Sequence, residues 1–211
     1  GSTLAVATAR GVWLVDESLQ TVRETLIRRY VQDVRWSPDG NYIAVTSRWR
    51  GCWVEVWSSD FRQLRFAAEV CGEQIAWRPQ SDRPTLALFN TDLYANEVPI
   101  IDVIAGAIEV VVGQDGIWSS NGELLFTRTV DGSMVFRPET LYGWNVNPID
   151  QVLDIDLRTD RDLKGRLVAA IDDRSLLLAC NQYTVTQDAV VVGLCRFDLA
   201  TEQLSNLYTV A

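Results

Sequence analysis

The chain has 211 residues, of which 47% are hydrophobic, enough to bury one sizeable core or a single array of repeats. Its formal net charge of −9 argues against a basic face that would neutralise phosphates, so nucleic acid is not an expected partner. No apolar run is long enough for membrane insertion. The sequence also has no histidine, and so lacks the commonest general base and the commonest metal ligand.

Strand–turn–strand patterns follow one another along the whole chain. Three strands are expected in residues 4–30, and the string DVRWSPDGNYIAVTS then opens a second group, in which VEVWSSDFRQLRFAA forms the outer hairpin. The strings QIAWRPQSDRPTLALF and GIWSSNGELLFTRT open a third and a fourth group in the same way, and RLVAAIDDRSLLLACN opens a fifth. In three groups the first strand ends at a tryptophan, and these residues, Trp36, Trp77 and Trp118, recur every 41 positions.

A fixed period of about 40 residues with this content indicates the blades of a β-propeller. We therefore predict an all-β fold, a single β-propeller domain of about five blades of four antiparallel strands, with the first blade incomplete. The three tryptophans are expected to be core residues between neighbouring blades, and the Ser-Pro-Asp-Gly string to be an ordinary turn. The expected blades are residues 4–30, 31–71, 72–113, 114–163 and 164–211.

The first predicted blade lacks its innermost strand, and neither end of the chain supplies it. A closed propeller usually completes one blade with strands from both termini, so that no sheet edge is left open. Three explanations stay open at this point. The domain is cut from a longer protein, a partner donates the strand, or the first blade has three strands.

The string VRWSPDGNYIAVTS, followed by VEVW, resembles the repeat of WD-repeat β-propellers and equally that of the TolB-like bacterial propellers with their SPDG turns. The residues match the repeat specifically in the second blade and partly in the third and fourth. In the first and fifth blades only the positions of the strands and turns match. The Gly-His and Trp-Asp dipeptides of true WD repeats are missing. The resemblance implies a ring of blades used as an interaction platform, mostly without catalysis, and it transfers no catalytic residue.

The loops on one face of the predicted ring are longer than the turns on the other, and long loops on a rigid scaffold are where binding usually resides. The string SRWRGCW concentrates guanidinium groups and large rings, which dominate interface hot spots. The alternative is a local cap in which the arginines stack on Trp49. The string NTDLYANEVP lacks the spacing of a calcium loop, so a polar binding loop is expected there and no metal. The candidate partner-binding residues are Arg48, Trp49, Arg50, Trp53, Asp92, Tyr94, Asn96 and Tyr183.

The four cysteines show no CxxC spacing, so a zinc site is not expected. Cys52 and Cys71 open and close one outer hairpin, where cross-strand distances fall in disulfide range, and we predict a Cys52–Cys71 bond. Cys180 and Cys195 are expected to lie some five residues out of register and to be buried free thiols. The bond would indicate an oxidising, extracytoplasmic compartment, and without it the cytoplasm is favoured.

Three functions compete. The leading prediction is a non-enzymatic scaffold without cofactors that binds a protein or peptide through its loop-rich face, and the acidic surface favours a partner bearing Arg or Lys. The alternative is an assembly module whose incomplete blade is completed by a strand from another chain or a missing segment. A carbohydrate-active hydrolase is less favoured. It would rely on the carboxylates of the inner strands, which here are Asp33, Glu73, Asp115 and Asp172.

Overall fold

The computed structural model describes residues 3–9, 11–16, 18, 20–25, 30–48, 50–90, 96–129, 140–146, 148–156, 165–172, 174–183 and 190–209. The chain forms two compact units. The first unit comprises residues 1–91 and 97–111, and the second comprises residues 92–96 and 112–211.

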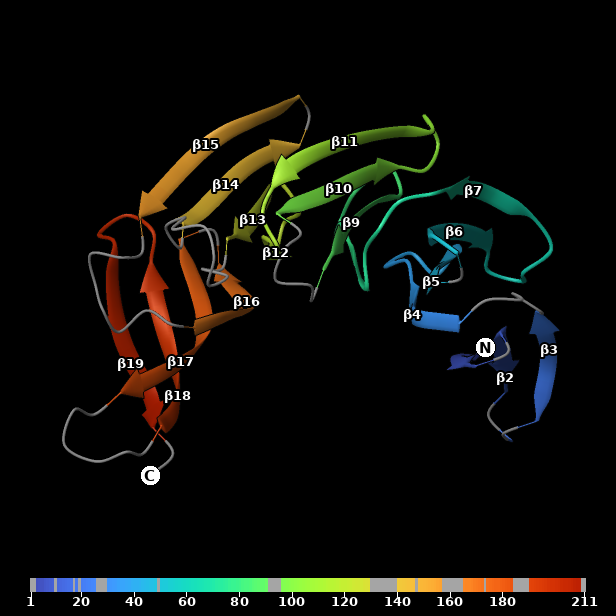
Figure 1. The fold of residues 1–211 in the computed structure, drawn as a ribbon, viewed down its shortest axis with the longest axis horizontal. Coiled ribbons are helices and arrows are strands. Elements are labelled where there is room, and N and C mark those ends of the chain that lie inside the picture. Colours follow the sequence, from blue (N-terminus) through green and yellow to red (C-terminus); the bar gives the residue numbers. More distant parts are fainter. Residues whose placement is uncertain are drawn as a thin grey trace. The chain divides into compact units, whose positions relative to one another are not determined.

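Three sheets lie in the first unit, apart from Val112, the last residue of the third sheet, which belongs to the second unit. In each sheet the strands follow chain order (Figure 1). Blade one has three strands, β1 (Leu4–Thr8), β2 (Gly11–Val15) and β3 (Thr21–Thr25). Blade two consists of β4 (Tyr30–Trp36), β5 (Tyr42–Arg48), β6 (Cys52–Ser58) and β7 (Leu64–Ala68). Blade three consists of β8 (Gln74–Trp77), β9 (Thr85–Phe89), β10 (Glu97–Asp102) and β11 (Ala107–Val112).

Two further sheets of four strands form the second unit. Blade four consists of β12 (Asp115–Trp118), β13 (Leu124–Arg128), β14 (Thr140–Val146) and β15 (Ile149–Asp156). Blade five consists of β16 (Gly165–Asp172), β17 (Ser175–Tyr183), β18 (Val190–Asp198) and β19 (Gln203–Thr209). The described chain thus has one three-stranded sheet and four four-stranded sheets, which confirms the predicted fold class with its incomplete first blade.

The turns that follow two of the inner strands share one arrangement of side chains. After β4, Gly40 adopts a φ of 71° and donates its N–H to the carbonyl of Ser37 at 2.9 Å, while Asp39 Oδ1 accepts from the N–H of Asn41 at 3.1 Å. Residues 119–124 repeat these contacts after β12. Glycine suits this position because side chains with a Cβ rarely adopt such a φ. The Ser-Pro-Asp-Gly string is therefore a structural turn, as predicted.

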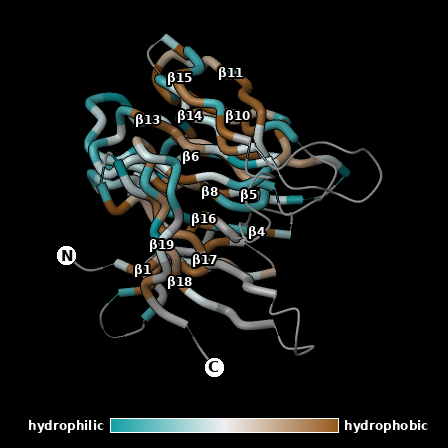
Figure 2. Tube along the Cα trace, turned by 90° about the vertical axis from the view of Figure 1, so that its left-hand side faces the viewer, coloured by the Kyte–Doolittle hydropathy of each residue, from teal (hydrophilic) through white to brown (hydrophobic). Residues whose placement is uncertain are grey.

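Apolar side chains from adjacent sheets of the first unit form two cores with matching membership. One core joins blades one and two, and the other joins blades two and three. The apolar residues lie along the strands and polar residues gather at the turns (Figure 2). The matching positions are Ala5, Val12 and Leu14 in blade one and Ala44, Val54 and Val56 in blade two. By this match of core positions β1 and β2 resemble β5 and β6, but β1 also lies beside β4 as closely as the innermost strands β4 and β8 lie beside each other.

The tryptophans that end the inner strands pack at cores, as the sequence predicted, but only Trp118 is buried, whereas Trp36 and Trp77 are half-buried at the margin of their cores. Trp36 packs against the core between blades one and two, and Trp77 packs against the core between blades two and three. The indole N–H of Trp77 also donates to the carbonyl of Arg35 in β4 at 3.1 Å. In the second unit Trp118 is 6% exposed, and a separate core forms between blades four and five around Phe126 and other buried residues.

Candidate functional site

A disulfide holds the base of the loop between β5 and β6. β5 ends at Arg48 directly opposite Cys52, the first residue of β6. Cys52 is bonded to Cys71 with 4.7 Å between their Cα atoms, so the predicted bond is confirmed. The loop turns through Arg50 and Gly51, which have φ values of 55° and 144°. These constraints fix the base of the loop, while Trp49 lies outside the described residues.

An exposed aromatic residue and an exposed arginine lie side by side at this end of blade two. Tyr30 begins β4 opposite Arg48, and cross-strand partners project from the same face of a sheet. Tyr30 is 61% exposed, and the side chain of Arg48 is 63% exposed. Arg50 is exposed as well, and Trp53 is half-buried. We call Tyr30, Arg48, Arg50 and Trp53 the blade-two patch.

Two glutamates surround the blade-two patch. Glu73 Oε1 lies 3.9 Å from Nη1 of Arg48. Glu69 packs so closely over Gly51 that a Cβ atom there would lie 2.5 Å from Glu69 Oε1. The patch therefore presents both signs of charge beside its aromatic rings. Sequence reasoning missed Tyr30 and both glutamates at this site, although Tyr30 begins an inner strand at the same end of the blade as the loop.

Of the other predicted binding residues, only Asn96 has a side chain that the structure describes. Asn96 is half-buried, its side-chain Oδ1 has no hydrogen-bond partner among the described residues, and its carbonyl accepts from the N–H of Gly113 at 3.1 Å. Asp92 and Tyr94 lie outside the described residues. Tyr183 ends β17 opposite Val190, and its side chain is outside the described set.

The inner-strand carboxylates that a hydrolase would need are each close to a guanidinium group. The carboxylate–guanidinium distances are 3.1 Å for Asp33 and Arg35, 3.9 Å for Glu73 and Arg48, 3.5 Å for Asp115 and Arg128, and 3.9 Å for Asp172 and Arg196. Asp33 also accepts the main-chain N–H of Ile75 in the next blade at 3.0 Å. These contacts give the four carboxylates structural partners.

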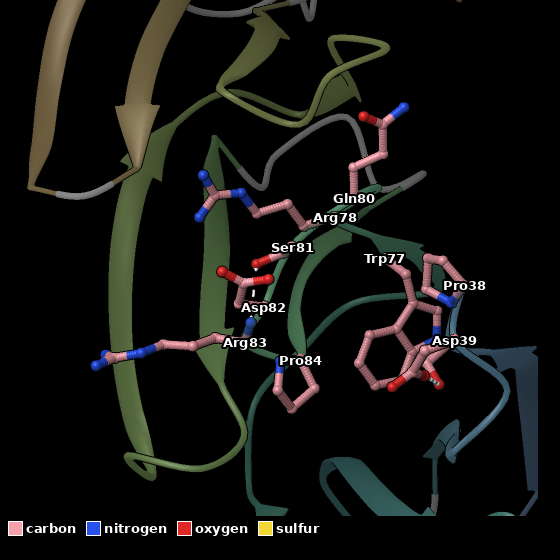
Figure 3. Close-up of a pocket in the computed structure, with 10 residues that line it drawn as sticks. Pro38, Asp39, Trp77, Arg78, Gln80, Ser81, Asp82, Arg83 and Pro84 are labelled. Carbon is pink, nitrogen blue, oxygen red and sulfur yellow. Dashed lines mark hydrogen bonds between the residues drawn. The ribbon is translucent and has the colours of Figure 1, made fainter.

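A hollow of about 320 Å³ lies on the opposite, short-turn side of blades two and three. Figure 3 shows the indole ring of Trp77 beside Pro38 and Asp39, with Asp82 and Pro84 on the other side of the hollow. Asp39 is already engaged, because Ser37 and Asn41 donate to it. Sequence reasoning did not find this hollow, since it is built by two short turns that come together only when the blades pack.

The expectation of a free thiol at Cys195 is wrong. Cys195 is 1% exposed and disulfide-bonded, so the protein has a second disulfide. The physical reason lies in the register, because Cys195 pairs with Leu178 and Cys180 pairs with Gly193. Residues 180 and 195 are therefore two positions out of register on one face of the sheet rather than five, a diagonal neighbour relationship. The side chain of Cys180 lies outside the described residues.

Comparison with known proteins identifies the fold and no family. No protein-family model matches the chain, and no curated protein matches it. Kuenenia stuttgartiensis hydrazine synthase is similar in structure, with a TM-score of 0.72 at 16% identity over 99% of this chain and 63% of that one. The dihydro-heme d1 dehydrogenase NirN, solved in complex with DHE, has a TM-score of 0.67 at 14% identity over 99% of this chain and 44% of that one. Both are β-propeller proteins, and this chain spans less than two thirds of the length of either.

The described residues contain no cluster of three or more His, Cys, Asp or Glu side chains placed to hold a metal ion. In the same part of the chain no helix has the length and apolar character needed to cross a membrane.

Proposed function

We propose that this chain is a non-enzymatic β-propeller domain that binds a protein or peptide partner through the loop-rich end of blade two. The observation that carries the proposal is the exposed Tyr30–Arg48 pair beside the Cys52–Cys71 disulfide. Tyr, Trp and Arg are the side chains most enriched at interface hot spots. A partner that covers this pair would gain buried aromatic area and guanidinium hydrogen bonds together.

The rigidity of the loop base supports binding at this patch. Residues already held in place lose less conformational entropy when a partner docks, so more of the contact energy appears as affinity. The Cys52–Cys71 disulfide supplies that rigidity.

Charge defines the kind of partner. The net charge of −9 steers a partner that bears Arg or Lys toward the domain. At the patch itself, Arg50 suits a carboxylate of the partner and Glu69 suits a cation, while Arg48 and Glu73 lie against each other and present both signs of charge together. A partner segment with both signs of charge around an apolar or aromatic residue fits this arrangement best.

The proposal of a binding domain rather than an enzyme draws on the pairing of the inner-strand carboxylates with arginines. It also draws on the resemblance of the blade-two repeat to WD-repeat and TolB-like propellers, which implies an interaction platform. The two disulfides support placement in an oxidising, extracytoplasmic compartment.

Peptides selected from a displayed random library on the immobilised domain test the proposal. Arg48→Ala and Tyr30→Ala are each expected to weaken binding of the selected peptides about tenfold, which corresponds to about 1.4 kcal/mol. Arg62→Ala is the matched control, because Arg62 is an exposed arginine of the same blade, paired with Asp60 at the turn between β6 and β7. Equal losses in all three variants, or none in the first two, would place the binding site elsewhere.

A further inference from the structure

We propose that the hollow beside Trp77 binds an arginine side chain of a partner polypeptide, with the guanidinium group stacked on the indole ring between the carboxylates of Asp39 and Asp82. The hollow has a volume of about 320 Å³ and lies on the short-turn side of blades two and three, away from the blade-two patch. It gives the domain a second contact with a polypeptide, independent of the first.

The turn that follows β8 is longer than its counterpart in blade two, and it builds one wall of the hollow. The N–H of Ser37 closes the blade-two turn around residues 38–41, and the N–H of Arg78 closes the blade-three turn around residues 79–84. The longer turn also holds Gln80 at a φ of 50°, which is uncommon for a residue other than glycine. The shorter turn is enough to close a hairpin, so the additional residues of blade three are free to serve the hollow.

The indole ring of Trp77 is held in a fixed orientation at the wall of the hollow. Its Nε1–H donates to the carbonyl of Arg35 at 3.1 Å, and the ring packs against the core between blades two and three. Trp77 is nevertheless only half-buried, and Figure 3 shows its ring beside Pro38 and Asp39. A cation over the face of an indole is attracted by the π electrons, and Trp is the strongest partner of this kind. A ring that is already held in place loses little entropy when a ligand stacks on it.

A carboxylate lies on each wall of the hollow. Asp39 Oδ1 accepts from the Ser37 hydroxyl and the Asn41 N–H, and Asp39 Oδ2 accepts from the Asn41 side chain at 2.7 Å. Partial burial raises the pKa of Asp39, but these hydrogen bonds outweigh it, so the pKa lies below its usual value and the group is ionised at neutral pH. A carboxylate oxygen can accept two hydrogen bonds, so Oδ2 has room for a guanidinium N–H. Asp82 is exposed on the opposite wall.

Two arginines also line the hollow, but their charges are directed elsewhere. Figure 3 shows the guanidinium groups of Arg78 and Arg83 extending away from the indole ring of Trp77. Arg83 Nη1 lies 3.6 Å from Oδ2 of Asp102, the last residue of β10. Beside the ring the hollow therefore favours a cation over an anion. The net charge of −9 steers cations toward the domain as well.

Arginine within a polypeptide is the cation that fits this site best. Its planar guanidinium group can stack on an indole while its in-plane N–H groups bond to carboxylates, which the compact ammonium group of lysine cannot do. The lining includes the exposed residues Pro38, Gln80 and Arg83, so the hollow opens at the surface. A polypeptide can thus insert one side chain while its main chain stays outside, whereas a small-molecule site buries most of its ligand.

The test is an NMR titration of the ¹⁵N-labelled domain with Nα-acetyl-arginine methylamide, a single arginine with a blocked main chain. We expect saturable shifts at the indole N–H of Trp77 and at the main-chain N–H groups of Gly40 and Ser81, with a dissociation constant in the millimolar range. The citrulline counterpart keeps the planar shape without the charge and should bind about fivefold more weakly. Nα-acetyl-glutamate methylamide, of opposite charge, should leave these resonances in place.

A matched pair of aspartate variants separates the hollow from the overall charge. Asp82→Asn should weaken the arginine probe about threefold, because it removes one carboxylate from the hollow. Asp60→Asn removes the same charge from an exposed aspartate on the same side of blade two, where Asp60 pairs with Arg62, and should leave the affinity unchanged. Trp77→Phe, with its weaker π face, should also cost about threefold. Circular dichroism of each variant checks that it is folded.

Arg48→Ala, the variant that tests the blade-two patch, should not alter binding of the arginine probe, so the two proposals stand or fall separately. Four results would overturn the proposal for the hollow. They are the absence of saturable shifts, equal affinity for the arginine and citrulline probes, tighter binding of the glutamate probe, and an equal loss in Asp82→Asn and Asp60→Asn. Free L-arginine is expected to bind no more tightly than the blocked probe, and much tighter binding would show that the site holds the amino acid rather than a polypeptide.

Discussion

Blades one and two bury matching side chains, but blade two has four strands and blade one has three. In blade two the innermost strand β4 places Asp33 and Arg35 where blade three can donate hydrogen bonds to them. In blade one β1 lies beside β4, and the buried indole N–H of Trp36 has no acceptor among the described residues. The inner strand of blade two thus serves two sheets, its own through the ladder and the next through the carbonyl of Arg35 and the carboxylate of Asp33. Blade one makes no matching hydrogen bond to Trp36 among the described residues.

Blade two differs from blade one also by its disulfide, and removing this bond is expected to give the largest loss of stability. Replacing both residues (Cys52→Ser with Cys71→Ser) should lower the free energy of unfolding by about 3 kcal/mol, because the bond closes a loop with a sequence separation of 19 residues. Urea denaturation at neutral pH measures the change. The double variant leaves the second disulfide intact, which a reductant would not. A loss below about 1 kcal/mol would show that the bond adds little to blade two.

A matched pair of core valines compares the two blades directly. Val12 in blade one and Val54 in blade two occupy equivalent core positions, and both are 0% exposed. Val54→Ala should cost roughly 2–3 kcal/mol through lost burial and the cavity left behind. Val12→Ala should cost less, because blade one, which has one strand fewer, can relax into the cavity. The urea denaturation midpoints of the two variants measure the two losses of stability. Equal losses would mean that blade one relaxes into the cavity no more than blade two does.

The fold could be predicted because its evidence is local and repeated. Trp36, Trp77 and Trp118 end inner strands at a constant interval. The turn at Gly40 requires a residue that tolerates a positive φ, and this requirement can be recognised in any copy of the repeat. The Cys52–Cys71 bond followed from the length of one hairpin. Each of these inferences needs only a short stretch of chain and a known geometry.

What the sequence could not predict depends on register and on contacts between blades. The pairing around Cys195 depends on where the nine-residue strand β18 begins and ends. The predicted register was wrong by a few residues, so a free thiol was expected where the structure has a disulfide. Tyr30 was missed at the blade-two patch because it joins Arg48 only through the cross-strand register. The hollow beside Trp77 is formed by two turns of separate blades. The orphaned donor of Trp36 becomes visible only by comparison with Trp77 in the folded chain.

The smallest expected effect concerns a feature that the two blades share, the aspartate in the turn between their outer strands. Hydrogen bonds from the Ser18 hydroxyl and the Gln20 N–H lower the pKa of Asp16 in blade one. In blade two the hydroxyl of Ser58 and the N–H of Arg62 lower the pKa of Asp60 in the same way. Both turns therefore favour the ionised carboxylate in the folded state.

The sign of the pH dependence follows from these lowered values. The folded-state pKa lies below the unfolded one, so the stabilisation is complete above the ordinary carboxylate pKa of about 4 and is lost as pH falls through the folded pKa. Thermal midpoints measured from pH 2 to pH 7 should fall at the acid end, and either Asp16→Asn or Asp60→Asn should make that fall shallower. Because both turns hold their aspartate by a serine hydroxyl and a main-chain N–H, the two variants should flatten the acid limb to a similar extent. A flattening confined to Asp60→Asn would assign the effect to the guanidinium of Arg62, 3.2 Å from Asp60, rather than to the turn hydrogen bonds that the two blades have in common.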